Sequence, residues 1–468
     1  MNQIISDVRV LSETEMELIH KSSLDILEKV GLSVPHEGAC RLAQALGAKV
    51  DVNDDYRMTF PREALLDVLE RIKREDPSVR AHDGGLEKLT GNVSTQIFLV
   101  DGAARTRRPG TLGDVMDGIF LQEGLENFPR ANAIVVPADA PEGMSDILSY
   151  QMIYKYSKKP GGTYVLTADS ARYITRMARA AGQEVTYLFD TVSPLTVRRE
   201  TLEIAMIFRE AGFGMSMTPM VMAGSTGPVS LAGMITLQNA EVLASLFLIY
   251  ALSGRGARYV VGGHTNDISR NMFCSFGSPN QALIGVAAAQ MARFYGLRSG
   301  SNAGLTDAVI PDFQSAAEKV LSASFACLAG TSAIGGQGIA GADQGFSMEQ
   351  LVLDNEWISM YNHVARGFTV DEDAIGLETI FEVGRGGNFL SEMHTVEYMR
   401  DSHFQSALFD RDSWDNLRGR VCDPLTLAHE RAQELIARHR VKDPVVAPAV
   451  AEEIDRIAAE AARDFARR

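Results

Sequence analysis

The sequence predicts a (β/α)8 TIM barrel, an α/β fold, with an N-terminal helical and small β extension and with C-terminal helices. From residue 130 onwards, short apolar runs alternate with helical stretches, which is typical of parallel βα units. The candidate strands begin roughly 20 to 45 residues apart, the length of one strand, one helix and two loops. No G-x-G-x-x-G run follows an early strand, so a doubly wound open sheet is the weaker alternative.

Seven runs have the length and apolar character of barrel strands. They are Ala133–Pro137, Thr163–Thr167, Val185–Asp190, Gly214–Met222, Tyr259–His264, Arg298–Asn302 and Ser332–Gly336. We expect one further strand in less clear sequence. The resulting division is an extension over residues 1–125, the barrel over 126–420 and C-terminal helices over 421–468.

The extension contains two helical patterns and one β-rich stretch. Ser12 and Glu15 form a capping box at the start of the first pattern, and Pro61 suits the first turn of the second. Residues 84–110 have short β-rich runs between turn residues, which predicts a small hairpin layer. At the other end of the chain, residues 427–441 and 450–468 are charged helical runs that we expect on the surface.

Charge and hydropathy exclude several classes of function. With 60 acidic against 45 basic residues, the net charge of −15 disfavours nucleic-acid binding and favours the attraction of cationic substrates. The first residues lack the basic and apolar regions of a secretory signal. The most apolar stretch, Ala240–Leu252, contains Glu241 and is shorter than the roughly 20 residues of a membrane span. We therefore expect a cytoplasmic protein.

Candidate site residues follow the predicted strands, because the site of a βα barrel lies at the carboxyl ends of its strands. These ends are polar or glycine-rich, beginning for example at Asp190, Ala223, Gly262 and Ser301. Glycine lets a large planar cofactor approach the backbone closely. The candidates for such contacts are Gly224, Ser225, Thr226, Gly262, Gly263 and Gly336. Turn formation alone would account equally well for any one of these loops.

His264 stands directly after an apolar strand and is followed by three polar residues. It could bind a carboxylate or tune a proton, or it could only orient its own loop. The chain has no H-E-x-x-H, G-x-S-x-G, P-loop or C-x-x-C motif. No metal site is therefore predicted and no catalytic residue is assigned, which leaves room for a reaction that needs little from side chains.

Several long runs resemble the trimethylamine methyltransferase family. They include AGSTGPVSLAGMITLQNAEVLASLFL, YVVGGHT, QMARFYGLRSGSNAGLTDAVIPDFQSAAEKVL, FSMEQLVLDNEWISM and FEVGRGGNFLSEMHTVEYMR, and they cover most of residues 220–415. VDGAARTRRPGTLGDVMD adds a match nearer the N-terminus. The resemblance implies a (β/α)8 barrel, in agreement with the strand spacing.

Every position is a standard residue, so the chain resembles the branch of this family without pyrrolysine. That branch includes methyltransferases for glycine betaine and related betaines, which pass a methyl group to cob(I)alamin on a separate corrinoid protein. The resemblance thus implies a quaternary or tertiary amine substrate, a corrinoid protein partner and no tightly bound cofactor. It also implies a homo-oligomer. The charge and hydropathy described above predict no nucleic-acid and no membrane partner.

A quaternary ammonium offers no hydrogen bonds at nitrogen, so aromatic faces and carboxylates should hold it. The candidate aromatic cage is Phe98, Tyr295, Phe346 and Tyr361, with Asp307, Asp343 and Glu349 as counter-charges. A betaine carboxylate would need donors, for which the candidates are His264, Asn302, Gln314 and Gln337. Core packing is the alternative role for each aromatic residue.

One departure from the family concerns residues 333–336, which read Ala-Ile-Gly-Gly where family members often have a histidine before the glycine. Loss of that histidine at Gly335 would fit an altered substrate, and it would equally fit a non-catalytic or sensory protein that binds a methylated amine. An unrelated barrel enzyme, such as an aldolase, would need a Lys or a metal cluster at a strand end. None of the predicted strands ends in Lys.

Overall fold

The computed structural model describes residues 7–81, 86–417 and 423–467. The expected boundary between residues 420 and 421 lies outside these ranges. Residues 7–81 form helices α1 (Glu13–Lys29), α2 (Glu37–Gln44) and α3 (Arg62–Glu75), with the small antiparallel sheet β1–β3–β2 (Leu32–Ser33, Arg57–Thr59, Lys49–Asp51). The expected capping box of Ser12 and Glu15 is present, and Pro61 is the N-cap of α3.

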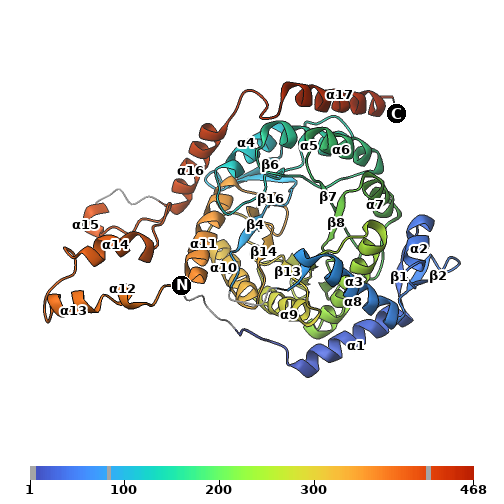
Figure 1. Ribbon diagram of the computed structural model, residues 1–468. Coiled ribbons are helices and arrows are strands. Elements are labelled where there is room, and N and C mark those ends of the chain that lie inside the picture. The colour runs from blue at the N-terminus through green and yellow to red at the C-terminus, as the bar shows by residue number, and fades with distance from the viewer. Residues whose placement is uncertain (1–6, 82–85, 418–422, 468) are drawn as a thin grey trace.

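Parallel strands form the ring at the centre of the molecule (Figure 1). Strands β10 (Tyr259–Val261), β13 (Ser299–Ser301), β14 (Ala333–Gly335) and β4 (Thr90–Asn92) pair in that order, and β7 (Thr186–Phe189) pairs with β8 (Gly214–Met217). The remaining two positions of the ring are the extended segments 133–135 and 162–164. They are joined by the hydrogen bond that Ala133 N donates to Gly162 O at 3.1 Å.

One helix follows each of these eight segments and lies outside the ring (Figure 1). In chain order they are α4 (Leu112–Glu123), α5 (Ser145–Tyr156), α6 (Ala168–Ala181), α7 (Arg199–Ala211), α8 (Leu231–Ser253), α9 (Asn280–Phe294), α10 (Phe313–Leu328) and α11 (Met348–Arg366). The (β/α)8 barrel expected from the sequence is thus confirmed.

The eighth strand, which the sequence pattern did not locate, is β4. It closes the ring by pairing with β14 in parallel register. We expected Thr90–Asn92 to belong to the N-terminal extension, before residue 126, and the structure corrects this placement. The segment Thr-Gly-Asn has no apolar run, so its pattern did not distinguish it from the turns around it.

Small sheets stand on the loops at the carboxyl ends of the barrel strands. The hairpin β5–β6 (Phe98–Asp101, Thr106–Pro109) follows β4 and pairs with β16 (Gly345–Phe346), which in turn pairs with β15 (Ile339–Ala340). The sheet β12–β11–β9 (Cys274–Ser275, His264–Asn266, Met222–Ala223) stands on the loops after β8 and β10. The hairpin expected within residues 84–110 is therefore part of the barrel mouth.

Helix α8 is an outer helix of the barrel that the N-terminal extension covers. It is long and apolar enough to cross a membrane by composition alone, but 72% of its most apolar window is buried inside the protein. It packs against α1, α2 and α3 and against β8 and β10. This agrees with the expected buried helix at Ala240–Leu252.

The C-terminal part has two packed helices and one projecting segment. Helix α16 (Pro424–His439) packs against α4 and α11, and α17 (Pro448–Phe465) packs against α5 and α6. Residues 367–402, here called the arm, contain α12 (Glu372–Ile375), α13 (Leu377–Val383) and α14 (Met393–Ser402) and extend away from the barrel (Figure 1). In the arm, no residue whose side chain the structure describes is buried. The short helix α15 (Trp414–Leu417) follows it.

Candidate functional site

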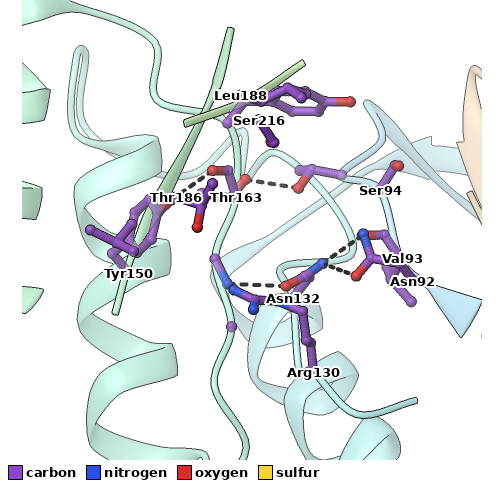
Figure 2. Close-up of a pocket in the computed structure, with 15 residues that line it drawn as sticks. Asn92, Val93, Ser94, Arg130, Asn132, Tyr150, Thr163, Thr186, Leu188 and Ser216 are labelled. Carbon is purple, nitrogen blue, oxygen red and sulfur yellow. Dashed lines mark hydrogen bonds between the residues drawn. The ribbon is translucent and has the colours of Figure 1, made fainter. Parts of the chain in front are cut away.

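The interior of the barrel holds a cavity of about 310 Å³. It is lined by Asn92, Val93, Ser94, Thr95, Arg130, Asn132, Tyr150, Gly161, Gly162, Thr163, Tyr164, Val185, Thr186, Leu188 and Ser216 (Figure 2). Bulky branched residues fill the interior of most TIM barrels, whereas most of these residues are small or polar. The volume is within the range of small-molecule sites. The sequence thus leaves this barrel hollow on the side of β4, β7 and β8.

Alternation along β7 explains how the cavity is kept open. Tyr187 and Phe189 are buried in the hydrophobic core, whereas Leu188 lines the cavity and Asp190 is exposed. Because successive strand residues point to opposite faces, Asp190 continues the inward face of Leu188 at the carboxyl end of the strand. The strand therefore delivers a carboxylate to the barrel mouth.

Three side chains form a polar group at the mouth, namely Tyr164, Asp190 and Asp343. Burial raises the pKa of Tyr164 to about 12, and the negative charges of Asp343 and then Asp190 add to this increase. Both carboxylates therefore lie within electrostatic range of one phenol. Tyr164 is 40% exposed, so its ring is open to a ligand although it lines the cavity.

Both mouth carboxylates titrate above their ordinary range. Partial desolvation raises the pKa of Asp190 to about 6, with Arg198 opposing the increase. Desolvation also raises the pKa of Asp343 to about 6, opposed by a 2.9 Å hydrogen bond that Gln96 Nε2 donates. At neutral pH both groups carry a negative charge at exposed positions where the surrounding protein reduces their solvation, and such a pair of charges suits the binding of a cation.

Asp343 is held in a strained turn. Its φ is +65°, and that of the preceding Ala342 is +52°, in the left-handed region that residues other than glycine seldom adopt. Such strain is often found at binding and active sites. The turn follows β15 and aims the carboxylate toward Gln96, which is itself buried and bridges to Val135.

The opposite end of the cavity is built on Asn132. Its amide donates to Asn92 Oδ1 at 3.0 Å and to Val93 O at 2.8 Å, and its Oδ1 accepts from Gly162 N at 3.1 Å (Figure 2). These bonds fasten three neighbouring segments of the ring together. Arg130 lines the cavity beside this network, on the far side from Leu188 and Ser216 (Figure 2).

His264 lies in β11 and is fully buried. Its Nδ1 is 3.0 Å from Gln281 Oε1, and its ring is 3.9 Å from the Phe276 ring, centre to centre. Within the described part of the chain its Nε2 has no hydrogen-bond partner. Burial lowers the pKa of His264 to about 4, so the ring is neutral at physiological pH. It supports the rim sheet and does not face the cavity described above.

The other candidate carboxylate donors are spread over several positions. Asn302 follows β13 directly, and its side chain lies near Gly262 and Gly335 at the strand ends. Gln337 is buried and accepts from Asn92 N at 3.0 Å. Gln314 is exposed on α10, where it donates to Glu318. Asn302 and Gln337 thus belong to the mouth, and Gln314 lies on the outer helix.

The candidate cage residues do not come together. Phe346 is fully buried in the core, and Tyr295 is buried with its hydroxyl in contact with Asn239 and His20. Phe98 faces the guanidinium of Arg107 at 4.4 Å, so a cation of the chain already covers its ring. Tyr361, on α11, contacts Cys327.

Asp307 and Glu349, which were named with Asp343 as counter-charges, are bound within the protein. Asp307 accepts from Ser275 Oγ and Phe276 N, both at 2.7 Å, and so fixes the strand β12. Glu349 accepts from Ser347 Oγ at 2.6 Å and lies 2.8 Å from His429 Nδ1 on α16. Of the three counter-charges, Asp343 is the one whose charge acts on a residue that lines the cavity, Tyr164.

The candidate cofactor contacts have structural partners of their own. A Cβ atom at Gly263 would lie 2.7 Å from Gln238 Oε1, and one at Gly336 would lie 2.3 Å from Leu305 Cδ2. A Cβ at Gly262 would likewise lie 2.8 Å from a Thr218 methyl group. Close packing against neighbouring side chains therefore accounts for these three glycines without a cofactor.

The loop that carries Gly224, Ser225 and Thr226 lies at the rim. Ser225 Oγ accepts from Asn266 Nδ2 at 2.7 Å, and Thr226 Oγ1 accepts from Met222 N at 2.9 Å. A Cβ at Gly224 would meet Ile268 at 2.2 Å. At Gly335, by contrast, a Cβ would have only Asn302 Oδ1 within 4 Å, at 3.7 Å, so this position is open.

Among the described residues, no group of three or more His, Cys, Asp or Glu side chains could hold a metal ion. A hollow (β/α)8 barrel whose interior cavity is lined by small and polar side chains is typical of enzymes that act on small molecules.

Comparison with known proteins identifies the family. The family model described as trimethylamine methyltransferase (MTTB) matches residues 1–465, and the chain belongs to this family. A glycine betaine methyltransferase of Desulfitobacterium hafniense (strain Y51) is 30% identical over 97% of this chain and 96% of its own length. The trimethylamine methyltransferase MttB of Desulfitobacterium hafniense (strain DSM 10664 / DCB-2) is 27% identical, over 92% and 89%. The chain is thus a methyltransferase.

Among solved structures, the monomethylamine methyltransferase MtmB of Methanosarcina barkeri aligns with 92% of this chain and 93% of its own. The sequence identity is 10% and the TM-score is 0.43.

Proposed function

We propose that this cytoplasmic methyltransferase moves a methyl group from a quaternary amine, glycine betaine or a related betaine, to cob(I)alamin on a partner corrinoid protein. The observation that carries the proposal is the mouth group of Tyr164, Asp190 and Asp343 over a hollow barrel. An aromatic face with adjacent carboxylates suits an ammonium that has no N–H to donate. The names of the two Desulfitobacterium relatives support the same class of substrate.

The reaction requires the breaking of one C–N bond. The corrinoid supplies the nucleophile that accepts the methyl group, and the electron pair of the broken bond stays on nitrogen, which leaves as a neutral tertiary amine. No proton moves in this step. The task of the chain is therefore to orient the substrate and to exclude water from it.

The test is methylation of cob(I)alamin, free or on a corrinoid protein, after a calorimetric screen of glycine betaine, carnitine, choline, proline betaine and trimethylamine. We expect a binding quaternary amine to give methylcobalamin and the demethylated amine in equal amounts. Binding with no methylation in the presence of corrinoid proteins would contradict the proposal and favour a sensory protein.

The proposal includes a homo-oligomer, and the arm supports it. Phe368, Phe381 and Leu390 are 73%, 72% and 84% exposed, and they are accompanied by Val370, Ile375, Leu377, Ile380, Phe389, Met393, Val396 and Met399. Exposed apolar surface of this extent is typical of an interface. Contact with a partner would bury roughly 500 Å² of the exposed rings of Phe368, Phe381 and Phe389 in the arm and of Trp414 just after it. A stable complex buries about 800 Å² of surface on each partner.

The same chain carries a second uncovered apolar surface on α10. Phe313, Val320, Leu321 and Phe325 are exposed, together with Ala316 and Ala317, at positions that share one helical face. None of these six residues is charged, so this face suits the apolar arm. We infer that the arm of one copy packs on α10 of a second copy.

Charge placed in the arm should separate the copies. For the double variant Phe381→Asp and Leu390→Asp, light scattering after size exclusion should give the single-chain mass of 50.9 kDa, while the wild type gives a multiple of it. Phe313→Asp with Phe325→Asp should do the same from the α10 side. Val52→Asp, at a 59% exposed site between β2 and β3, is the control and should leave the mass unchanged. A monomeric wild type at micromolar concentration would contradict the inference.

A further inference from the structure

Arg130 is the one charged side chain among the residues that line the cavity. It precedes the barrel segment 133–135 and is partly buried. Within the described ranges, its guanidinium forms no hydrogen bond, ion pair or ring contact with another residue. Its charge is nevertheless felt nearby: burial raises the pKa of Tyr150 and Tyr154, and Arg130 offsets part of that increase.

A guanidinium in a recess has five N–H donors to satisfy. The side-chain amide of Asn132, which also lines the cavity, has its carbonyl and its nitrogen engaged with Asn92, Val93 and Gly162. Thr95 and Thr163 share a 2.8 Å hydrogen bond. These neighbours therefore shape the wall without supplying a negative charge. Arginine is the side chain best suited to bidentate recognition of a carboxylate.

The cavity thus has a cation at one end and carboxylates at the other. Gly161 and Tyr164 both line it and are three residues apart in one extended segment, a length of about 10 Å. Tyr164, Asp190 and Asp343 mark the mouth. Arg130 lies at the other end of the cavity, away from Leu188 and Ser216 (Figure 2), and marks the floor. A ligand that matches both ends is a zwitterion with its ammonium at the mouth and its carboxylate below.

We propose that Arg130 is a specificity-determining residue, which binds the carboxylate of a methylated zwitterion at the floor of the barrel and so turns its N-methyl groups toward the mouth. The inference rests on the proposed function and names its substrate class. Arg130 would give betaines a higher affinity than trimethylamine or choline, because these two amines have no carboxylate for the guanidinium to bind.

The experiment compares carboxylate and ester forms of the same cation. Calorimetry at pH 7.5 would use trimethylammonioacetate, 4-(trimethylammonio)butanoate and the methyl ester of each. The wild type should bind the acid of at least one pair tenfold more tightly than its ester. Arg130→Gln should abolish that preference and leave ester binding within twofold, and Arg130→Lys should restore part of it. Arg172→Gln, an exposed arginine on α6, is the matched control.

Three outcomes would overturn the inference. The first is the absence of any preference for an acid over its ester in the wild type. The second is equal binding of the acid by wild type and Arg130→Gln, provided that both have the same thermal midpoint. The third is tighter binding of inorganic phosphate than of either zwitterion, because that would make the floor a site for a free anion.

A separate readout distinguishes this inference from the proposed function. If the acids methylate cob(I)alamin equally well with wild type and Arg130→Gln, the proposed function stands and the role of Arg130 fails. If no compound methylates cob(I)alamin but the preference for the acid depends on Arg130, the anion subsite stands and the proposed methyl transfer fails.

Discussion

Replacing Lys319 by Met should cost about 3 to 5 kcal/mol of the free energy of unfolding. Lys319 on α10 and Asp354 on α11 are both completely buried, and Lys319 Nζ lies 3.1 Å from Asp354 Oδ2. Removal of the lysine leaves a carboxylate in the core with no opposite charge. The penalty is large because the remaining ion cannot reach water.

Asp354 links α11 to the mouth of the barrel. Besides Lys319 it accepts from Gly338 N at 2.7 Å, from Gln350 Nε2 at 2.9 Å and from Trp357 Nε1 at 2.8 Å. Gly338 begins the segment that leads to the strained turn at Asp343. The Lys319→Met variant should therefore lose order at the mouth as well as stability.

Urea unfolding followed by tryptophan fluorescence measures the effect, since Trp357 donates directly to Asp354. The matched control is Lys155→Met. Lys155 is also nearly buried, but its partner Asp455 is 48% exposed and can be hydrated when the lysine is gone. We expect a loss of about 1 kcal/mol or less there. Equal losses in the two variants would show that the burial of Asp354 does not determine the penalty.

The sequence predicted most of the barrel because seven of its segments have an apolar run between turn residues. The pattern fails at β4, where the segment Thr90–Asn92 has no apolar run and Asn92 contributes a polar side chain to the cavity. In a barrel with a filled interior, the inward-facing position of β4 would hold a bulky apolar residue. The segment would then have had the apolar run that predicts a strand. The missed strand and the open cavity thus have one physical cause.

The candidate site was predicted less well, for reasons that differ between residues. Asp343 was named because a carboxylate in a predicted loop is an evident counter-charge. Tyr164 and Asp190 fell within predicted strands, and only the alternation of Tyr187 and Phe189 with Leu188 could have shown that Asp190 points inward. Arg130 precedes its strand, at the end of a barrel where catalytic residues are not expected. Only the structure shows that it reaches the cavity.

The mouth carboxylates should make cation binding depend on pH between about 7 and 5. Asp190 and Asp343 have pKa values of about 6 in the folded protein, so both are charged at pH 7.5 and become protonated as the pH falls through 6. Calorimetry with tetramethylammonium should show affinity that is constant above pH 7 and falls on acidification. Asp343→Asn and Asp190→Asn should each weaken binding at pH 7.5 by roughly five- to tenfold, the effect of one nearby charge in a partly hydrated site.

Folding stability should respond to the same two groups with the opposite sign. Their pKa is raised from about 3.8 in the unfolded chain, so the folded protein takes up more protons between pH 6 and 4. Their charges therefore destabilise the fold at neutral pH, and this cost decreases as the pH falls from about 6 to about 4, the range between the folded and unfolded pKa values. Asp343→Asn should lower affinity for the cation at pH 7.5 and at the same time raise the thermal midpoint, with both differences from wild type shrinking near pH 5.

Asp267→Asn separates this effect from a change in net charge. Asp267 lies in the loop after β11, where it pairs with Arg270 at 3.8 Å and accepts from Ser269 Oγ. Its replacement removes one negative charge near the mouth but leaves the carboxylates of Asp190 and Asp343 in place. The affinity for tetramethylammonium and the pH dependence of that affinity should therefore match those of the wild type. If a mouth carboxylate stabilises the fold, its replacement by asparagine lowers the thermal midpoint. If it binds a cationic substrate at a cost in stability, the replacement lowers cation affinity and raises the thermal midpoint, as predicted for Asp343. The sign of the change in thermal midpoint therefore distinguishes the two roles.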